Sequence, residues 1–231
     1  MTASPALVIP APAPVLLPVS GSEARFPVRR VYCVGRNYAD HAREMGHDPD
    51  AEPPFFFQKN ADNLVTDGRF PYPALSEDVH YEVELAVLLG AGGRDIARAD
   101  AAATIYGYAV ALDMTRRDLQ AKAKKAGRPW EAAKAAEFSA PIGLVAPASA
   151  VSGIAEAAIS LSVNGAVKQS ARISDMIWPI EDVIAHLSTL FILAPGDVIL
   201  TGTPAGVGPV VRGDVMEASV EGLPGLVVTV V

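Results

Sequence analysis

The sequence predicts an α+β fold in which a mixed or antiparallel system of strands dominates and a few helices lie at the periphery. Segments with strand periodicity outnumber segments with helical periodicity, and hairpin turn signals outnumber strand–helix–strand units. Half of the 231 residues are apolar, so the chain can bury a sizeable core. Since no internal repeat and no convincing linker interrupts it, we expect residues 25–231 to form one domain.

Charge and cysteine content exclude several classes of function. The net charge is −7 and there is no basic stripe, so we expect no nucleic-acid partner. No apolar stretch approaches the length of a membrane span, and prolines interrupt an N-terminus that lacks the basic region of a signal peptide. The single cysteine, Cys33, excludes an intramolecular disulfide framework and a thiolate zinc site. We therefore expect a cytoplasmic protein that binds no membrane.

The chain begins with segments of different character. Residues 1–24 are rich in proline and alanine and have no period, so we expect an extended arm lying on the body, with one short strand at 15–17. The apolar segment 28–34 predicts a strand. A helix over 38–44 should follow and end at Gly46, because glycine commonly terminates helices.

Short apolar segments alternate with turn signals through the remainder. The strongest hairpin signal is Asn164-Gly165, which predicts strands at 159–163 and 166–169. Apolar residues at helical spacing predict an amphipathic helix over 180–191. The other expected elements are strands at 55–57, 105–112 and 198–200 and helices at 96–104 and 131–136.

An acidic strand provides the first candidate site. Residues 79–85 alternate between apolar and polar, which places His80, Glu82 and Glu84 on one face of a strand. Two adjacent carboxylates repel each other, so a fold keeps them either in open solvent or around a cation. The apolar run that continues to Leu89 leads the strand into a core and favours the cation; a solvated acidic edge is the alternative. We do not expect His80 to be a ligand.

A third ligand is expected at Asp113, at the end of the buried strand 105–112, where the backbone is rigid and the tip is open. Magnesium and manganese prefer such oxygen ligands. The alternative is that Asp113 caps a helix. Thr115 and Asp118 have the spacing of a capping box and predict a helix that opens there and continues to Lys125.

Three further features are weak when each is taken alone. His41 and Glu44 share a helix face, as an acid–base dyad or as a solvated surface. Lys134 lies among alanines, where it either points to an anion or lies on a helix surface. The turn 201–204 suits a carboxylate or is an ordinary β-turn.

Five motifs follow one another along the chain. They are Gly-Arg-Asn-Tyr-x-x-His-x-x-Glu (35–44), Tyr-Glu-x-Glu-Leu (81–85), Leu-Asp-Met-Thr-Arg-Arg-Asp-Leu-Gln (112–120), Ser-Asp-Met-Ile (174–177) and Gly-Asp-Val-Ile-Leu-Thr-Gly-Thr-Pro-x-Gly-Val-Gly (196–208). In this combination they are highly specific. From about residue 25 to its C-terminus, the chain resembles the fumarylacetoacetate hydrolase family.

The resemblance implies the mixed β-roll of that family, a homodimer, and Mg²⁺ or Mn²⁺ bound by Glu82, Glu84 and Asp113. It implies that His41 and Glu44 activate water from a short helix that orders as a lid, and that Lys134 neutralises enolate charge. The residues that it places in contact with the substrate are Arg36, Lys59, Arg117, Gln120 and Thr203. The sequence departs from the family pattern at Asn60, where relatives usually carry proline.

Within the family, segments 26–38, 41–46 and 53–57 look most like bacterial fumarylpyruvate and acylpyruvate hydrolases, which act late in gentisate-type degradation of aromatic compounds. This implies hydrolysis of the C–C bond of a 2,4-diketo acid, with fumarylpyruvate giving fumarate and pyruvate. Decarboxylation of oxaloacetate, or isomerisation and decarboxylation of hydroxymuconate-type diacids, would use the same metal site. A different class is a non-catalytic protein whose acidic face binds Ca²⁺ or a partner.

Overall fold

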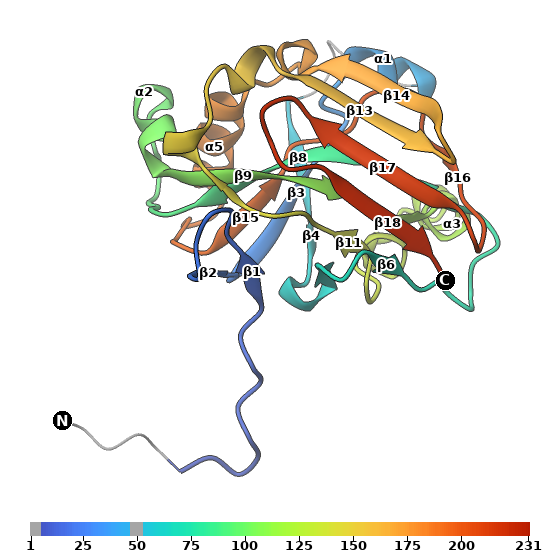
Figure 1. The fold of residues 1–231 in the computed structure, drawn as a ribbon, viewed down its shortest axis with the longest axis horizontal. Helices are drawn as coiled ribbons and strands as arrows, with labels where there is room; N and C mark the ends of the chain where they lie inside the picture. The colour runs from blue at the N-terminus through green and yellow to red at the C-terminus, as the bar shows by residue number, and fades with distance from the viewer. Residues whose placement is uncertain (1–5, 47–52) are drawn as a thin grey trace.

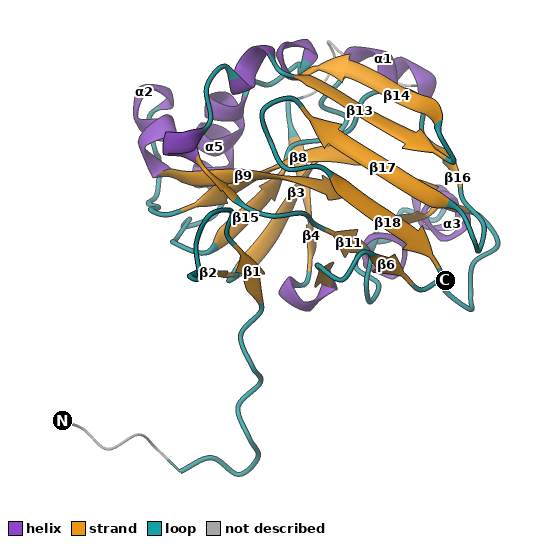
Figure 2. Cartoon of the chain, in the orientation of Figure 1, coloured by secondary structure: helices purple, strands orange, loops and turns teal. Residues whose placement is uncertain are grey.

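The computed structural model describes residues 6–46 and 53–231, which form two packed mixed sheets with short helices at their edges (Figures 1 and 2). The larger sheet has six strands in the order β12-β9-β8-β15-β3-β4, and the smaller has five in the order β14-β13-β17-β18-β6. Most neighbouring strands are antiparallel, but β15 and β3 are parallel, as are β18 and β6. The predicted α+β class with mixed sheets is confirmed.

The strands of the two sheets are drawn from the whole chain. The six-stranded sheet comprises β3 (Arg30–Gly35), β4 (Phe55–Lys59), β8 (Val83–Leu89), β9 (Ile105–Leu112), β12 (Ala146–Pro147) and β15 (Asp197–Leu200). The five-stranded sheet comprises β6 (Arg69–Phe70), β13 (Ala158–Val163), β14 (Ala166–Arg172), β17 (Val215–Val220) and β18 (Leu226–Val230).

Shorter elements complete the fold. The helices are α1 (Ala39–Glu44), α2 (Arg98–Ala101), α3 (Arg117–Lys125), α4 (Glu131–Lys134) and α5 (Ile180–Leu190). Three small sheets pair β1 (Leu16–Pro18) with β2 (Arg25–Pro27), β5 (Leu64–Val65) with β11 (Ala140–Pro141), and β7 (Val79–Tyr81) with both β10 (Thr115–Arg116) and β16 (Gly208–Pro209).

Strand β8 lies at the centre of the core, and all seven of its residues are buried. Its alternate side chains enter two apolar clusters. Leu85 and Val87 pack in the cluster between the two sheets, together with residues of β13 and β17. Ala86 and Leu88 pack in a second cluster on the other face of the six-stranded sheet, which β1 and β2 help to cover. Burial on both faces explains the continuous apolar run that follows Leu85.

The predicted strand over 79–89 is divided in two at Glu82, where the chain passes from β7 in a three-stranded sheet to β8 in the six-stranded sheet. Val83 is paired with Leu112, the last residue of β9. The backbone N–H of Asp113 donates to the carbonyl of Glu82 at 2.8 Å, directly beyond that pair. The register of β8 against β9 therefore places Glu82 and Asp113 side by side at the point where the three-stranded sheet and the six-stranded sheet separate.

The capping box predicted at Thr115 is wrong. Thr115 pairs with His80 as part of β10, and its hydroxyl donates to the carbonyl of Asp113 at 3.1 Å. Helix α3 begins at Arg117, so Asp113 does not cap it either. Pairing with a strand distant in sequence has overridden the local helix signal.

Other predicted elements are confirmed with small changes in length. Asn164 and Gly165 both have positive φ, at 51° and 78°, as a type I′ turn requires, and they join β13 to β14. The helix predicted over 96–104 is shorter, because only Arg98–Ala101 is α-helical and Ala102–Thr104 forms a 3₁₀ turn. At Asn60, the backbone N–H donates to the side chain of Asn63 at 2.9 Å, a bond that proline could not make.

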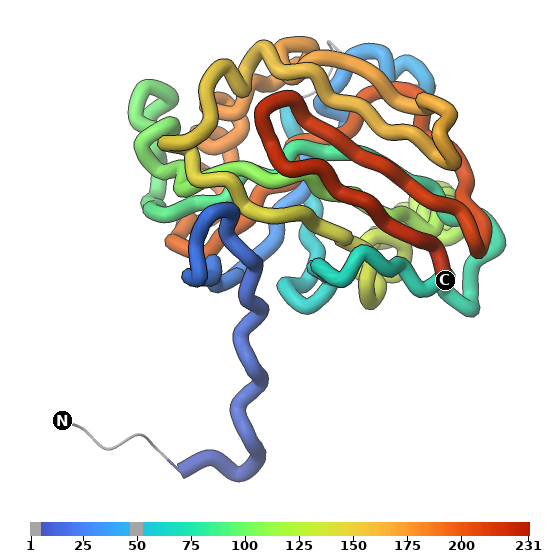
Figure 3. Tube along the Cα trace, viewed as in Figure 1, coloured from blue at the N-terminus to red at the C-terminus, as the bar shows by residue number. Residues whose placement is uncertain are grey.

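The N-terminal segment differs in part from the arm predicted over 1–24. Residues 6–14 are exposed and lead away from the body (Figure 3), whereas Leu17 and Val19 are buried against it. The expectation that the arm lies on the body is thus met from β1 onward and is wrong for residues 6–14. Among the described residues, no helix is long and apolar enough to cross a membrane.

Candidate active site

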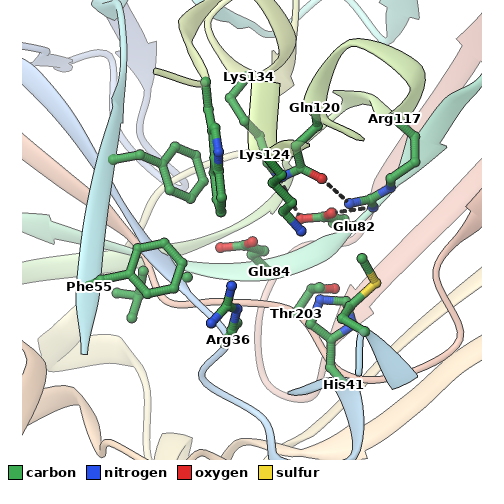
Figure 4. A pocket seen from close by; sticks show the side chains of 15 residues that line it. Arg36, His41, Phe55, Glu82, Glu84, Arg117, Gln120, Lys124, Lys134 and Thr203 are labelled. Carbon is green, nitrogen blue, oxygen red and sulfur yellow. Dashed lines mark hydrogen bonds and ion pairs between the residues drawn. The ribbon is translucent and has the colours of Figure 1, made fainter. Parts of the chain in front are cut away.

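A pocket lies where β7 passes into β8, and its walls come from β3, β4, β8, α1, α3, α4 and the loop after β15 (Figure 4). All of the residues predicted to form the site line this pocket except Glu44, Lys59 and Asp113, which lie directly behind residues that do. Segments separated by more than 160 positions in the sequence, such as α1 and the loop at Gly206, are in contact here.

Glu82, Glu84 and Asp113 form a buried acidic trio. One carboxylate oxygen from each residue lies within 4.8 Å of the other two. The three residues are 5%, 2% and 0% exposed. A solvated acidic edge, the alternative that the sequence left open, is therefore excluded. His80 does not join the trio and instead pairs with Asp78, whose carboxylate lies 2.8 Å from its Nε2.

Glu84 lies in an environment that disfavours its charge. Within the described part of the chain its carboxylate makes one hydrogen bond, accepted from the backbone N–H of Gly202 at 2.7 Å. Burial, with the carboxylates of Asp113 and Glu82 nearby, raises the pKa of Glu84 well above its ordinary value. Gly202 has a φ of +98°, so the turn that supplies this N–H requires glycine.

Glu82 is in the opposite electrostatic situation. Burial by itself would raise its pKa, but Lys134 and Arg117 outweigh that effect and hold the pKa of Glu82 well below its ordinary value. The Lys134 ammonium lies 2.8 Å from one carboxylate oxygen, and the Arg117 guanidinium lies 2.5 Å from the other. Glu82 is therefore ionised.

Lys134 links two members of the trio. Its ammonium donates to Glu82 at 2.8 Å and to Asp113 at 2.7 Å. Burial tends to lower the pKa of Lys134, but Asp113 and Glu82 outweigh burial and raise it, so this lysine is a fixed cation. The alternative of a solvated helix surface does not apply, because Lys134 is 3% exposed.

Lys59 supports the site from behind. Its buried ammonium lies 2.8 Å from Oδ1 of Asp113 and donates to Ser139 Oγ at 2.9 Å and to the Lys134 carbonyl. It fixes Asp113 and the end of α4, but it does not line the pocket. Its predicted contact with substrate remains a prediction that this placement does not favour.

The acidic trio fits a divalent cation. Three carboxylates supply oxygen donors from rigid positions at the start of β8 and the end of β9. Oδ1 of Asp113 accepts no hydrogen bond within the described residues, because its ion pair with Lys59 lies outside hydrogen-bond geometry. The Glu84 carboxyl group has no ion-pair partner among the same residues. A bound cation would satisfy both groups.

His41 and Glu44 lie at the pocket on α1. Nδ1 of His41 is 3.1 Å from the Glu44 carboxylate, which also accepts from the backbone N–H of Gly206 at 3.2 Å. His41 is 7% exposed and lines the pocket together with Glu82 and Glu84. The arrangement suits a base whose ring is oriented by a carboxylate and lines the same pocket as Glu82 and Glu84.

The polar wall opposite α1 comes mainly from α3. Arg117 donates to Gln120 Oε1 at 2.7 Å as well as to Glu82, so both side chains are held toward the trio (Figure 4). Thr203, in the loop after β15, accepts a hydrogen bond from the buried side chain of Gln169 at 2.8 Å. The polar side chains of Arg117, Gln120 and Thr203 line the same pocket as Glu84.

Sequence reasoning missed several residues of this site. Gln169 positions Thr203 and also accepts from the backbone N–H of Val83 at 3.0 Å, but no local pattern marked it. Phe55 and Trp130 form an aromatic wall, with ring centroids 5.5 Å apart. Lys124 also lines the pocket. Its helical spacing from Arg117 and Gln120 was a signal that could have identified it.

Comparisons with known proteins agree with this geometry. A family model described as "Fumarylacetoacetate (FAA) hydrolase C-terminal" matches residues 30–231. The chain is similar to fumarylpyruvate hydrolase from Pseudomonas aeruginosa, solved in complex with Mn²⁺ and pyruvate, with 50% identity, a TM-score of 0.96 and coverage of 98% of this chain and 99% of that one.

Two relatives have other names. The chain is 44% identical to oxaloacetate tautomerase YcgM of Escherichia coli (strain K12), over 87% of this chain and 93% of that protein. It is 40% identical to a mitochondrial oxaloacetate decarboxylase of Dictyostelium discoideum, over 84% of this chain and 90% of that protein.

Proposed function

Since this chain belongs to the fumarylacetoacetate hydrolase family, we propose that it is a metal-dependent hydrolase that cleaves the C–C bond of a 2,4-diketo acid, with fumarylpyruvate as the preferred substrate. The single observation that supports hydrolysis most directly is the His41–Glu44 pair beside the acidic trio, because hydrolysis requires an activated water. The relative with 50% identity was solved with Mn²⁺ and pyruvate, the product that all acylpyruvates share.

Glu82, Glu84 and Asp113 are the proposed ligands of Mg²⁺ or Mn²⁺, which when bound supplies a Lewis acid for the oxygens of the 2-keto acid. Arg117, Gln120 and Thr203 converge on the same space and are proposed to hold the substrate carboxylate and 2-keto group. This places the distal carbonyl of the substrate on the side of the pocket where His41 lies.

His41 is proposed to accept a proton from water through Nε2, while Glu44 orients the ring and stabilises the imidazolium. The hydroxide attacks the 4-keto carbon, and the bond between C3 and C4 then breaks. Its electron pair stays on C3, so pyruvate leaves as its enolate and the other fragment leaves as a carboxylic acid. The proton that His41 takes from water is then returned to C3 of the enolate, which gives pyruvate.

Lys134 is proposed to stabilise the enolate charge. Its ammonium is buried and lies within 2.8 Å of Glu82 and Asp113, and its raised pKa keeps it protonated. A preorganised, buried cation acts more strongly on developing charge than it would in solvent.

A second candidate function is tautomerisation or decarboxylation of oxaloacetate, which the names of two relatives at 44% and 40% identity support. Oxaloacetate is also a 2-keto acid that chelates a divalent cation, and decarboxylation passes through the same enolate. Neither reaction needs an activated water.

The experiment that tests the proposal follows the ultraviolet absorbance of fumarylpyruvate mixed with protein and Mn²⁺, and then with chelator. Oxaloacetate is assayed in parallel. Metal-dependent loss of the enol band at a rate well above any reaction of oxaloacetate would support hydrolysis. Reaction of oxaloacetate alone would replace hydrolysis by the second candidate.

The setting of the enzyme is part of the same proposal. We expect a homodimer, an extended arm over 1–24 ahead of a catalytic domain over 25–231, and a reducing cytoplasm, consistent with a free and buried Cys33. Size-exclusion chromatography with light scattering tests the dimer, since it measures mass independently of shape.

A further inference from the structure

Gln169 is a buried amide to which the proposed reaction assigns no part. It is fully buried, and no other residue of β14 is buried, so this polar side chain is the one that the strand sends into the protein. A β-bulge directs it there. Leu161 pairs with Gln169, and Ser162 pairs with Val167, so Lys168 has no residue opposite it. Bulges beside active sites commonly redirect a side chain in this way.

Both ends of the Gln169 amide have hydrogen-bond partners. Its Oε1 accepts from the backbone N–H of Val83 at 3.0 Å, and its Nε2 donates to Thr203 Oγ1 at 2.8 Å and to the Pro204 carbonyl at 2.7 Å. A backbone N–H can only donate and a carbonyl can only accept. The amide oxygen must therefore face β8 and the amide nitrogen must face the loop after β15.

This orientation decides where the hydroxyl proton of Thr203 can go. The hydroxyl oxygen accepts from Gln169, so its own proton cannot be donated back to that amide nitrogen. Within the described residues the Thr203 hydroxyl donates to no other group. Thr203 is 2% exposed and lines the pocket (Figure 4). Its proton is therefore available to a ligand in the pocket.

Gln120 is oriented by the same device. Its Oε1 accepts from Arg117 at 2.7 Å, and its amide nitrogen donates to no group in the described part of the chain. Gln120 also lines the pocket, so its N–H groups are available there. In both cases a neighbour occupies the accepting atom and leaves the donor, which suits a ligand oxygen that only accepts, such as that of a carboxylate or a ketone.

The competing explanation is that Gln169 merely holds the loop in place. The loop has other anchors, however. The backbone N–H of Gly202 donates to Glu84 at 2.7 Å. A Cβ at Gly206 would meet the carbonyl oxygen of Lys168 at 2.1 Å, so the loop backbone lies directly on β14. What the amide alone supplies to the loop is its two donated hydrogen bonds.

We propose that Gln169 is a positioning residue: by donating to Oγ1 of Thr203, it makes that hydroxyl a hydrogen-bond donor to the keto-acid end of the substrate. This rests on the proposed function, in which Thr203 contacts the substrate carboxylate or 2-keto group. Gln169 itself does not line the pocket and acts only through Thr203.

A double-mutant cycle tests the proposal by binding instead of turnover. The probe is pyruvate, titrated calorimetrically into the Mn²⁺-loaded protein. Thr203→Val removes the hydroxyl at nearly constant volume and should weaken pyruvate binding about tenfold or more, as expected for a hydrogen bond to a charged group. Gln169→Met should weaken binding at least about threefold when Thr203 is present and should have no further effect in the Thr203→Val background.

Two further variants keep the test decisive if Gln169→Met folds poorly. Gln169→Glu has the same shape and still accepts from Val83, but it has at most one proton for two acceptors, so its loss of affinity should also depend on Thr203. Asn37→Leu is the matched control. The amide of Asn37 is likewise fully buried and donates to the Thr201 carbonyl at 2.8 Å, but it reaches no hydroxyl of the pocket. Any effect of Asn37→Leu should be equal in both backgrounds.

The outcomes separate the positioning role from the proposed reaction. Wild-type affinity in Thr203→Val, wild-type affinity in Gln169→Met, or an equal loss from Gln169→Met in both backgrounds would overturn the proposal, even if acylpyruvates are hydrolysed. A wild type that does not bind pyruvate would overturn it as well. Conversely, a loss that depends on Thr203 supports the positioning role even if no acylpyruvate is hydrolysed, in which case only the proposed reaction fails.

Discussion

Replacing Glu84 by glutamine should separate metal binding from folding. The amide oxygen can still accept the hydrogen bond from Gly202, so the local geometry should survive. The substitution removes a carboxyl group whose charged form burial and two neighbouring carboxylates disfavour. The metal-free variant should therefore be at least as stable as the metal-free wild type, whereas metal binding should weaken.

The expected size of the effect follows from ligand-binding linkage. Mn²⁺ at a hundred times its Kd adds about 2.7 kcal/mol to the free energy of unfolding. For a chain of 231 residues, this raises Tm by about 5–10 °C. If Glu84→Gln weakens affinity about a hundredfold, the same Mn²⁺ concentration adds only about 0.4 kcal/mol and the shift falls to about 1 °C.

Thermal unfolding with Mn²⁺ and with chelator measures both quantities in one experiment. Glu77→Gln is the matched control, because Glu77 is exposed and outside the trio, and its metal-induced shift should equal that of the wild type. A full shift in Glu84→Gln would refute the assignment of Glu84 as a ligand. A large loss of metal-free stability in the same variant would instead make Glu84 a structural residue.

The remaining predictions concern the base and the buried cation. His41→Ala should lower kcat by a factor of about 100 or more in steady-state kinetics and leave the Mn²⁺-induced Tm shift intact; unchanged kcat would remove His41 from the mechanism. Lys134→Met should cost about 3–5 kcal/mol in urea unfolding with chelator present, because Glu82 and Asp113 lose their shared partner; a cost within error would contradict the pairing.

Local periodicity predicted much of the fold and the acidic trio. The alternation over 79–85 placed Glu82 and Glu84 on one face of a strand, and the apolar run after it favoured a buried position over a solvated edge. The division of that strand at Glu82 was not predictable in this way. It depends on the pairing of β7 with two strands that are distant in sequence. In β10, Thr115 pairs with His80, which lies 35 residues earlier, and in β16, Gly208 pairs with Tyr81, which lies more than 120 residues earlier.

The same limit explains the error at Thr115 and the unexpected placement of Lys59. Thr115 has a local helix-start signal, but a strand partner across the sheet determines its conformation. The family pattern placed Lys59 near the substrate, whereas packing places its ammonium behind Asp113 and the α4 backbone. The contacts of Gln169, which link β8 to the loop at Thr203, join segments that no local pattern relates.

The central claim is that this metal site hydrolyses an acylpyruvate, and product analysis of fumarylpyruvate incubated with the Mn²⁺-loaded protein tests it most directly. Proton NMR of the reaction should show one fumarate and one pyruvate for each fumarylpyruvate consumed, with no products when chelator is present. Fumarylpyruvate that persists, or that changes only between its keto and enol forms, would contradict the account.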